Sequence, residues 1–145
     1  MAITQAICNT FKEELLQGDH NFDSGGDVFK LALYTSAATL DSSTTVYTST
    51  NEVAASGQYV SGGGTLVNSG TSVVGGVAFC DFADLSFTGV TLTARGALIY
   101  NTSATVANAA VAVLDFTTDK SASDGTFTII FPADTGAAAI LRISG

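Results

Sequence analysis

The amino-acid sequence predicts a mainly β protein: an antiparallel β-sandwich or jelly-roll-like domain with one N-terminal α-helix. Short apolar runs, separated by turns that contain Gly, Asp or Asn, recur through the second half of the chain. Only one stretch, near the N-terminus, repeats its apolar residues at helical spacing. The polar residues are mainly 20 Thr and 14 Ser, and only 12% of the residues are charged, about half of the usual share. Such a composition suits strands and turns better than helices.

The length of 145 residues predicts a single domain, residues 1–145, because such a chain can bury roughly 68–70% of its unfolded surface. The formal net charge is −8, and the five Lys and Arg residues are scattered singly. This pattern argues against nucleic acid as a partner, since no basic patch is present to replace the counterions of phosphates. We also expect no membrane contact, because no apolar run is long enough to span a bilayer and the chain does not start like a secretory signal.

Residues 3–17 form the predicted helix, which Gly18 ends. The apolar residues of one helical face recur at the right spacing: Ile3, Ile7, Cys8, Phe11 and Leu15. Such a helix can pack on the sheet of its own domain or dock on a partner subunit, and amphipathicity allows both. The two cysteines, Cys8 and Cys80, lie on different elements without metal-binding spacing, so we expect both to be reduced and buried.

Residues 19–27 contain the pattern most similar to a metal site. Side-chain oxygens at positions 19, 21, 23 and 27 repeat the odd-numbered ligands of a calcium-binding loop. However, Ser24 stands where that loop needs Gly, and Lys30 replaces its last acidic ligand. A cation at that place opposes calcium binding, so we predict a solvated turn built from Asp, Asn and Gly. His20 is the only histidine, so a zinc site lacks a second imidazole.

Residues 28–36 form the first predicted core strand, since their side chains alternate in the period of a strand. Residues 37–76 are rich in Ser, Thr and Gly, without Lys, Arg or His. This segment is either a long excursion ordered by neighbouring subunits or a set of short edge strands and loops. Its glycines at 62–64 lack the Lys and Ser/Thr of a phosphate-binding loop. Residues 77–144 supply the other core strands, at 77–85, 87–93 leading into the Arg95 strand at 92–101, 110–116, 126–131 and 138–144.

Arg95 is the only charged residue between Asp84 and Asp115, and an uninterrupted apolar run, residues 97–100, follows it. Such a run is typical of a strand that is covered on both faces, so we expect Arg95 on a central strand. A buried guanidinium keeps its charge and must be paired, here with a carboxylate of a neighbouring strand. Replacing Arg95 with Leu is therefore expected to change stability by a few kcal/mol, because a buried partner would lose its ion pair.

The sequence contains no catalytic, cofactor-binding or metal-binding residues that we would assign, and we expect no enzyme. A Ser or Cys nucleophile needs a nearby base, and the single His lies in a turn. Three carboxylates border core strands: Asp81, Asp84 and Asp115. They could serve a glycosidase, but the chain has no Trp and only four scattered Tyr that could stack on a sugar. We interpret these aspartates as turn formers or as partners of Arg95 and Arg142.

In order and over nearly the whole chain, a set of segments resembles a family of small virion structural proteins of tailed bacteriophages. No single segment is specific, but the combination is. The matching segments are Phe11 to Gly18, Phe29 to Ser36, Tyr47 to Val53, Ala94 to Asn101, Ala112 to Phe116, Phe127 to Pro132 and Ile140 to Ile143.

This resemblance implies a non-enzymatic capsid decoration (cement) protein without cofactors, located on the outer surface of the virion capsid after synthesis in the bacterial cytoplasm. Its implied partners are the major capsid protein and itself, as a homo-oligomer such as a dimer or trimer. Alternatives are a tail, connector or fibre component, or a carbohydrate-binding adhesive module. We expect residues 37–76 and the N-terminal helix to supply the contacts, so that deleting 54–72 spares folding and abolishes capsid occupancy.

Overall fold

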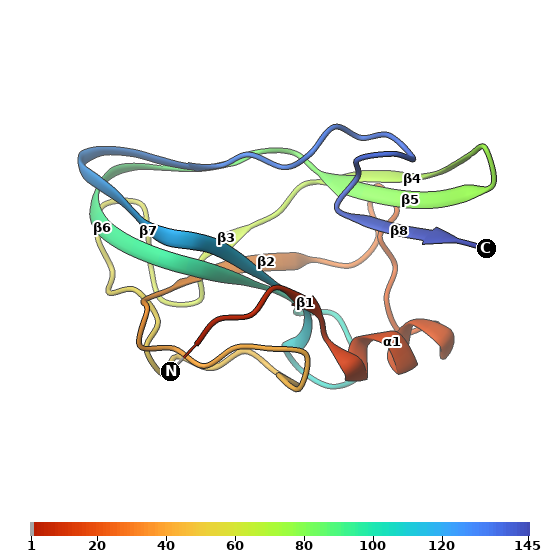
Figure 1. Cartoon of the computed structure of the whole chain (residues 1–145), viewed down its shortest axis with the longest axis horizontal. Helices are drawn as coiled ribbons and strands as arrows, with labels where there is room; N and C mark the ends of the chain where they lie inside the picture. Colours follow the sequence, from red (N-terminus) through yellow and green to blue (C-terminus); the bar gives the residue numbers. More distant parts are fainter. Residues whose placement is uncertain (1) are drawn as a thin grey trace.

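A long hairpin connects the two layers of the molecule. It consists of β6 (Leu85–Asn101) and β7 (Ala109–Ile129), which pair from Asn101↔Ala109 near the turn to Leu85↔Ile129 at the open end. In the computed structural model, which describes residues 2–145, the hairpin leaves one sheet and curves over to the other (Figure 1). Several register shifts along the hairpin accompany this bend, as bulges increase twist and curvature.

Two antiparallel sheets form the fold. The five-stranded sheet has the order β1-β7-β6-β2-β3, and the three-stranded sheet has the order β4-β5-β8. The remaining elements are β1 (Ala6–Ile7), α1 (Asn9–Leu16), β2 (Phe29–Tyr34), β3 (Gly64–Thr65), β4 (Asn68–Val74), β5 (Val77–Phe82) and β8 (Leu141–Ser144). The predicted mainly β fold with antiparallel sheets and one short N-terminal helix is therefore confirmed.

The core lies between these sheets and is rich in phenylalanine. Phe29 of β2 stacks on Phe22 with ring centroids 4.4 Å apart, and Phe82 of β5 contacts Phe29 at 5.6 Å. Phe131 continues the chain of rings at 5.6 Å from Phe82. These four rings connect both sheets with the 18–28 turn, and full burial of each side chain contributes roughly 1.5–3 kcal/mol.

The predicted helix over residues 3–17 is too long, since α1 covers only Asn9–Leu16. Ala6 and Ile7 instead pair with β7, and Ile3 forms a bridge to Leu40. The edge of the sheet offers backbone partners to these residues, and β-branched Ile suits extended backbone. Helical spacing of apolar residues in this segment therefore does not correspond to one helical face.

The strand predictions hold with one main difference. β2 confirms the first core strand, and β6 is central, between β7 and β2, as expected for the Arg95 strand. However, the segments 110–116 and 126–131 belong largely to one strand, β7, because Lys120, Ser121, Ala122 and Gly125 between them pair with β6. Thr117 and Asp124 have positive φ, so the turn signal at Asp124 marks a bend inside this strand.

Residues 37–76 form short strands and loops that pack on the protein's own core. β3 and β4 lie in this segment, and isolated bridges join Glu52 to Tyr34 and Val46 to Ala109. Four of its large apolar residues are buried in the core, Leu40, Val53, Tyr59 and Leu66, with Leu40 and Tyr59 at 1% and 0% exposure. Of the two alternatives for this segment, the one with short strands and loops is therefore correct.

Candidate functional site

The turn after α1 is held by hydrogen bonds between its own residues. The Asn21 side-chain oxygen accepts the N–H of Asp23 (3.0 Å), and Asp27 Oδ2 accepts the N–H of Asn21 (2.9 Å). The oxygens that imitate calcium ligands in the sequence thus serve the backbone of the turn. This confirms the predicted Asp/Asn/Gly turn.

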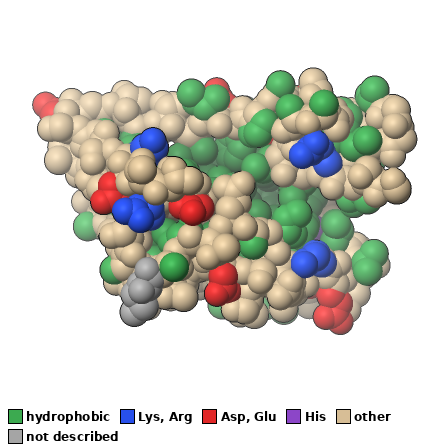
Figure 2. Space-filling model, in the orientation of Figure 1, with side chains coloured by type: hydrophobic (Ala, Val, Ile, Leu, Met, Phe, Trp, Pro, Cys, Tyr) green, Lys and Arg blue, Asp and Glu red, His purple; other side chains and the backbone are tan. Residues whose placement is uncertain are grey.

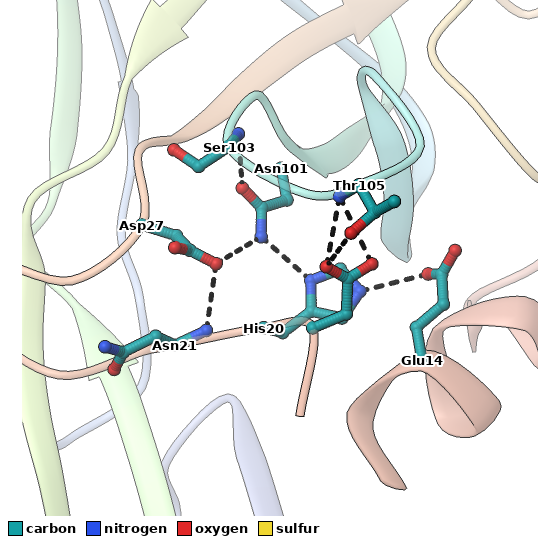
Figure 3. Close-up of polar contacts among 8 residues, drawn as sticks. Glu14, His20, Asn21, Asp27, Asn101, Ser103 and Thr105 are labelled. Atoms are coloured by element: carbon teal, nitrogen blue, oxygen red, sulfur yellow. Dashed lines mark hydrogen bonds and ion pairs between the residues drawn. The ribbon is translucent and has the colours of Figure 1, made fainter. Parts of the chain in front are cut away.

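His20 lies beneath this turn, and both of its ring nitrogens have partners (Figure 3). Asn101 of β6 sets their roles. Its amide oxygen accepts the N–H of Ser103 (2.8 Å), so its nitrogen donates both to Asp27 Oδ2 (2.8 Å) and to His20 Nδ1 (2.9 Å). Nδ1 is therefore an acceptor, and Nε2–H donates to Glu14 Oε1 (3.0 Å). The ring is neutral in this network and ties α1 to β6.

Glu14, Asp19 and His20 place one potential metal ligand each within 4.8 Å of one another. These atoms already take part in hydrogen bonds within the protein. The Nε2 proton of His20 points to Glu14, and Asp19 Oδ1 accepts from both the N–H (3.0 Å) and the hydroxyl (2.8 Å) of Thr105. The Thr105 hydrogen bonds lower the pKa of Asp19, which favours its ionised, accepting form. We interpret the cluster as a structural hydrogen-bond network.

The His20 side chain is fully buried, so it is also badly placed for acid–base catalysis. A general base must reach a substrate proton with a free nitrogen lone pair. Here that lone pair, on Nδ1, faces the Asn101 amide. The residue instead fixes the turn that forms one end of the groove described below.

A second polar network surrounds Glu52. Its carboxylate accepts from the hydroxyls of Tyr47 (2.6 Å) and Tyr59 (2.8 Å) and from the N–H of Gly62 (2.7 Å). Tyr100 stacks on Tyr47 with centroids 4.8 Å apart and donates to the Gly62 carbonyl (2.6 Å). Burial raises the pKa of Tyr100 to about 12. The aromatic rings thus fasten the 47–63 loop to β2 and β6 and point inward.

Sequence reasoning did not single out Glu52. A signal was nevertheless present, because Glu52 is the only acidic residue between Asp41 and Asp81. A lone carboxylate in a segment that also holds Tyr47 and Tyr59 could have suggested a hydrogen-bond hub. The pairing itself depends on how the loop folds back, which local sequence patterns do not reveal.

An apolar groove of about 990 Å³ opens between α1 and the sheet β4-β5-β8. Figure 2 shows hydrophobic side chains gathered in this hollow, on the right half of the face in view. Phe11 and Leu15 of α1 line one wall. The inner face of the sheet forms the other, with paired residues of its three strands: Thr71, Cys80 and Leu141 in one row and Val73, Ala78 and Ile143 in the next.

The outer part of this groove leaves large apolar side chains in water. Val73 is 71% exposed, Ile143 is 62% exposed, and Ile7, just before α1, is 40% exposed. Lys12 of α1 and Arg142 of β8 are the cationic residues of the lining. The groove is the best candidate for a functional site, since it combines a concave apolar surface with a few charged groups.

The aspartates named from the sequence serve as backbone acceptors. Asp81, Asp84 and Asp115 accept the N–H groups of Phe82, Phe131 and Thr117, respectively. The interpretation as turn formers holds for Asp115 alone, which accepts from the N–H two residues later, whereas Asp81 lies inside β5 and Asp84 bonds the distant Phe131. Their alternative role as arginine partners is wrong: Arg95 Nε donates to Asp119 Oδ1 (2.8 Å), and Arg142 Nη1 donates to the Ala137 carbonyl (2.8 Å).

Arg95 has the expected partner on a neighbouring strand, but the pair is only half-buried. The side chains of Arg95 and Asp119 are 35% and 48% exposed. The expectation of a buried guanidinium is therefore wrong. The two cysteines, in contrast, are free and buried as predicted.

Neither a membrane-crossing helix nor a known relative was found. The only α-helix between residues 2 and 145 is α1, whose eight residues fall far short of the roughly 20 that a bilayer requires. Comparisons with protein-family models, with curated proteins and with solved structures gave no match to this chain.

Proposed function

We propose that the protein is a non-enzymatic structural component of a tailed-bacteriophage virion, and that it acts as a capsid cement protein on the outer capsid surface. The groove between α1 and the sheet β4-β5-β8 carries this proposal. A monomer that keeps the neighbouring groove residues Val73 and Ile143 in water needs a reason to do so, and a docked neighbour supplies one.

The rest of the molecule supports a docking role. The curved β6–β7 hairpin connects two sheets into one body, so that contacts made at one end are held by a stiff frame. The net charge of −8 keeps the free protein soluble despite its apolar patch. The sequence resemblance gives the partner, the major capsid protein, and the repeated capsid lattice would multiply contacts that are weak one by one.

A carbohydrate-binding role receives less support. Sugar sites usually present aromatic faces to solvent, whereas Tyr34, Tyr59 and Tyr100 are buried and Tyr47 is stacked on Tyr100. The polar groups that resemble catalytic ones are also occupied, since His20 and Glu52 bind side chains and backbone of their own chain.

The test is binding to capsids that lack this protein. The molar mass of the purified protein in solution is first measured by light scattering. The protein is then titrated onto such capsids, with isolated tails and a glycan array as comparisons. We expect a discrete oligomer that saturates capsids at a fixed ratio and raises their resistance to heat. Saturable binding to tails or glycans, without binding to capsids, would refute the cement function.

A further inference from the structure

The charge of the groove is opposite to that of the molecule. The chain has 13 acidic and five basic residues, yet no Asp or Glu lines the groove and two of the five basic residues do. Within residues 2–145, neither Lys12 nor Arg142 takes part in a salt bridge. The only histidine of the lining, His20, is neutral in its hydrogen-bond network. Lys12 thus stands unneutralised at the groove wall, whereas Arg142, between the groove residues Leu141 and Ile143, projects to the other face of β8, where its guanidinium donates to the Ala137 carbonyl and has no counter-charge among the described residues.

A free sheet edge borders the same groove. β8 pairs with β5 on one side, and no strand of the described chain pairs with its other side. The inward residues of β8, Leu141 and Ile143, belong to the groove lining. An extended chain that adds to β8 would thus gain backbone hydrogen bonds and at the same time place every second side chain over the apolar floor.

We propose that this groove binds an extended segment of a partner protein in which apolar and acidic residues alternate. The segment pairs with the free edge of β8, its apolar side chains fill the space between Phe11, Leu15 and the sheet, and its carboxylates alternate to the outer face of the added strand, beside Arg142. The volume of about 990 Å³ is at the upper end of the roughly 300–1,000 Å³ of small-molecule pockets, which leaves room for several side chains. This inference rests on the proposed function, under which the segment belongs to the major capsid subunit.

A second copy of this chain fits the groove less well. Two copies that meet groove to groove would bring the Lys12 cations of both close together, and each copy carries a net charge of −8, so that the copies repel each other overall. A fatty acid would satisfy the apolar floor and one cation. It would make no use of the edge of β8 and would leave one cation without a counter-charge.

The experiment compares matched charge reversals. Lys12→Glu and Arg142→Glu place acids at the groove, whereas Lys120→Glu makes the same change on exposed β7, outside the groove lining. On capsids that lack the protein, we expect each groove variant to lower affinity about ten-fold and Lys120→Glu to change it less than two-fold. Amide hydrogen exchange of the bound protein should show slower exchange in β8. Equal affinity of all three variants would overturn the groove inference and leave the cement function intact.

A direct probe separates the two proposals. A labelled ten-residue peptide of alternating Val and Glu is titrated onto the free protein, next to the same peptide with Lys in place of Glu. If only the Glu peptide binds and Lys12→Glu weakens this binding, the groove inference is supported. If the protein then does not bind capsids, only the cement function is refuted. Binding of neither peptide, equal binding of both, or preference for dodecanoate without protection of β8 would overturn the inference.

Discussion

Arg95 and Asp119 face each other across β6 and β7 with a large part of both side chains in water. Exposed ion pairs contribute about 0–1 kcal/mol, because solvent screens the charges and the side chains lose freedom. We therefore predict that Arg95→Leu lowers the free energy of unfolding by less than about 1 kcal/mol, measured by urea denaturation. A loss of several kcal/mol would mean that the guanidinium is buried in solution.

The position of Asp119 illustrates what a sequence does not reveal at the scale of one residue. A partner for Arg95 on another strand was predictable from the need to balance its charge. Which carboxylate it would be was not, since β6 and β7 lose register here: Ala94 pairs with Lys120, and Gly96 pairs with Asp115. The four residues 116–119 thus bulge opposite Arg95 alone, and the bulge brings Asp119 to the guanidinium.

Asp81 is a second informative residue, because its carboxylate is only 2% exposed. Oδ1 accepts the Phe82 N–H, while Oδ2 has no hydrogen-bond partner among residues 2–145. Burial raises the pKa of Asp81 above its usual value, and the nearby Asp134 carboxylate adds to this. The folded protein thus takes up this proton at a higher pH than the unfolded chain. The ionised form costs stability at neutral pH, and the cost disappears as the pH falls from the raised pKa to the unfolded value.

Asp81→Asn removes this charge and keeps the shape of the side chain. We predict that it raises the free energy of unfolding at pH 7 by about 1 kcal/mol, and that the gain shrinks as the pH is lowered toward 4. Urea denaturation of wild type and variant over this pH range measures it. Asp84→Asn is the matched control, since Asp84 is exposed and should give no gain. A constant difference between Asp81→Asn and wild type at every pH would contradict the linkage to ionisation.

At the scale of elements, local sequence patterns predicted the presence of strands better than they predicted where helices and strands begin and end. β2, β5 and β8 follow from alternation and from apolar runs between turns. The start of α1 and the continuity of β7 do not, because both depend on pairing with distant residues: β1 with β7, and residues 120–125 of β7 with β6. The groove could not be predicted from local sequence patterns either. Its walls come from α1 and from strands 60 to 130 residues later, and only the fold brings Lys12 and Arg142 to one hollow.

The 54–72 segment is part of the core framework, contrary to the expectation that it can be deleted without loss of folding. Tyr59 is fully buried and accepts the Leu33 N–H (2.8 Å), and residues 68–72 belong to β4. We therefore expect deletion of 54–72 to unfold the protein. A point substitution tests this role with less disruption than the deletion, and Gly63 is the position where the largest effect is expected.

Gly63 lies at φ +81° directly against β2, where a Cβ atom would overlap the Leu31 carbonyl oxygen. Gly75, in the β4–β5 turn, has a similar φ of +59° with open space around it. Both Gly→Ala changes add roughly 1 kcal/mol of backbone strain, and Gly63→Ala must also displace β2. We predict that Gly63→Ala is less stable than Gly75→Ala by at least about 2 kcal/mol in urea denaturation. Equal losses would show that the loop around Gly63 yields without disturbing β2.

At the scale of the whole molecule, one hydrophobic cluster includes α1, both sheets and the 37–66 loops. Cys8 at the start of α1 and Cys80 of β5 both belong to it, at opposite walls of the groove region. A single shared core predicts that these elements unfold together, in one cooperative step. A groove that is open in the free protein raises the alternative that α1 separates first.

The two thiols distinguish these outcomes. Burial raises the pKa of Cys8 to about 11 and that of Cys80 to about 12, so both stay protonated at pH 8 in the folded protein. We predict that neither reacts with Ellman's reagent under native conditions and that both become reactive at the same urea concentration, together with the loss of β-sheet circular dichroism. Single variants Cys8→Ala and Cys80→Ala assign each thiol. Reaction of Cys8 at lower urea than Cys80 would show that α1 leaves the sheet before the core opens, because only local opening can then expose it.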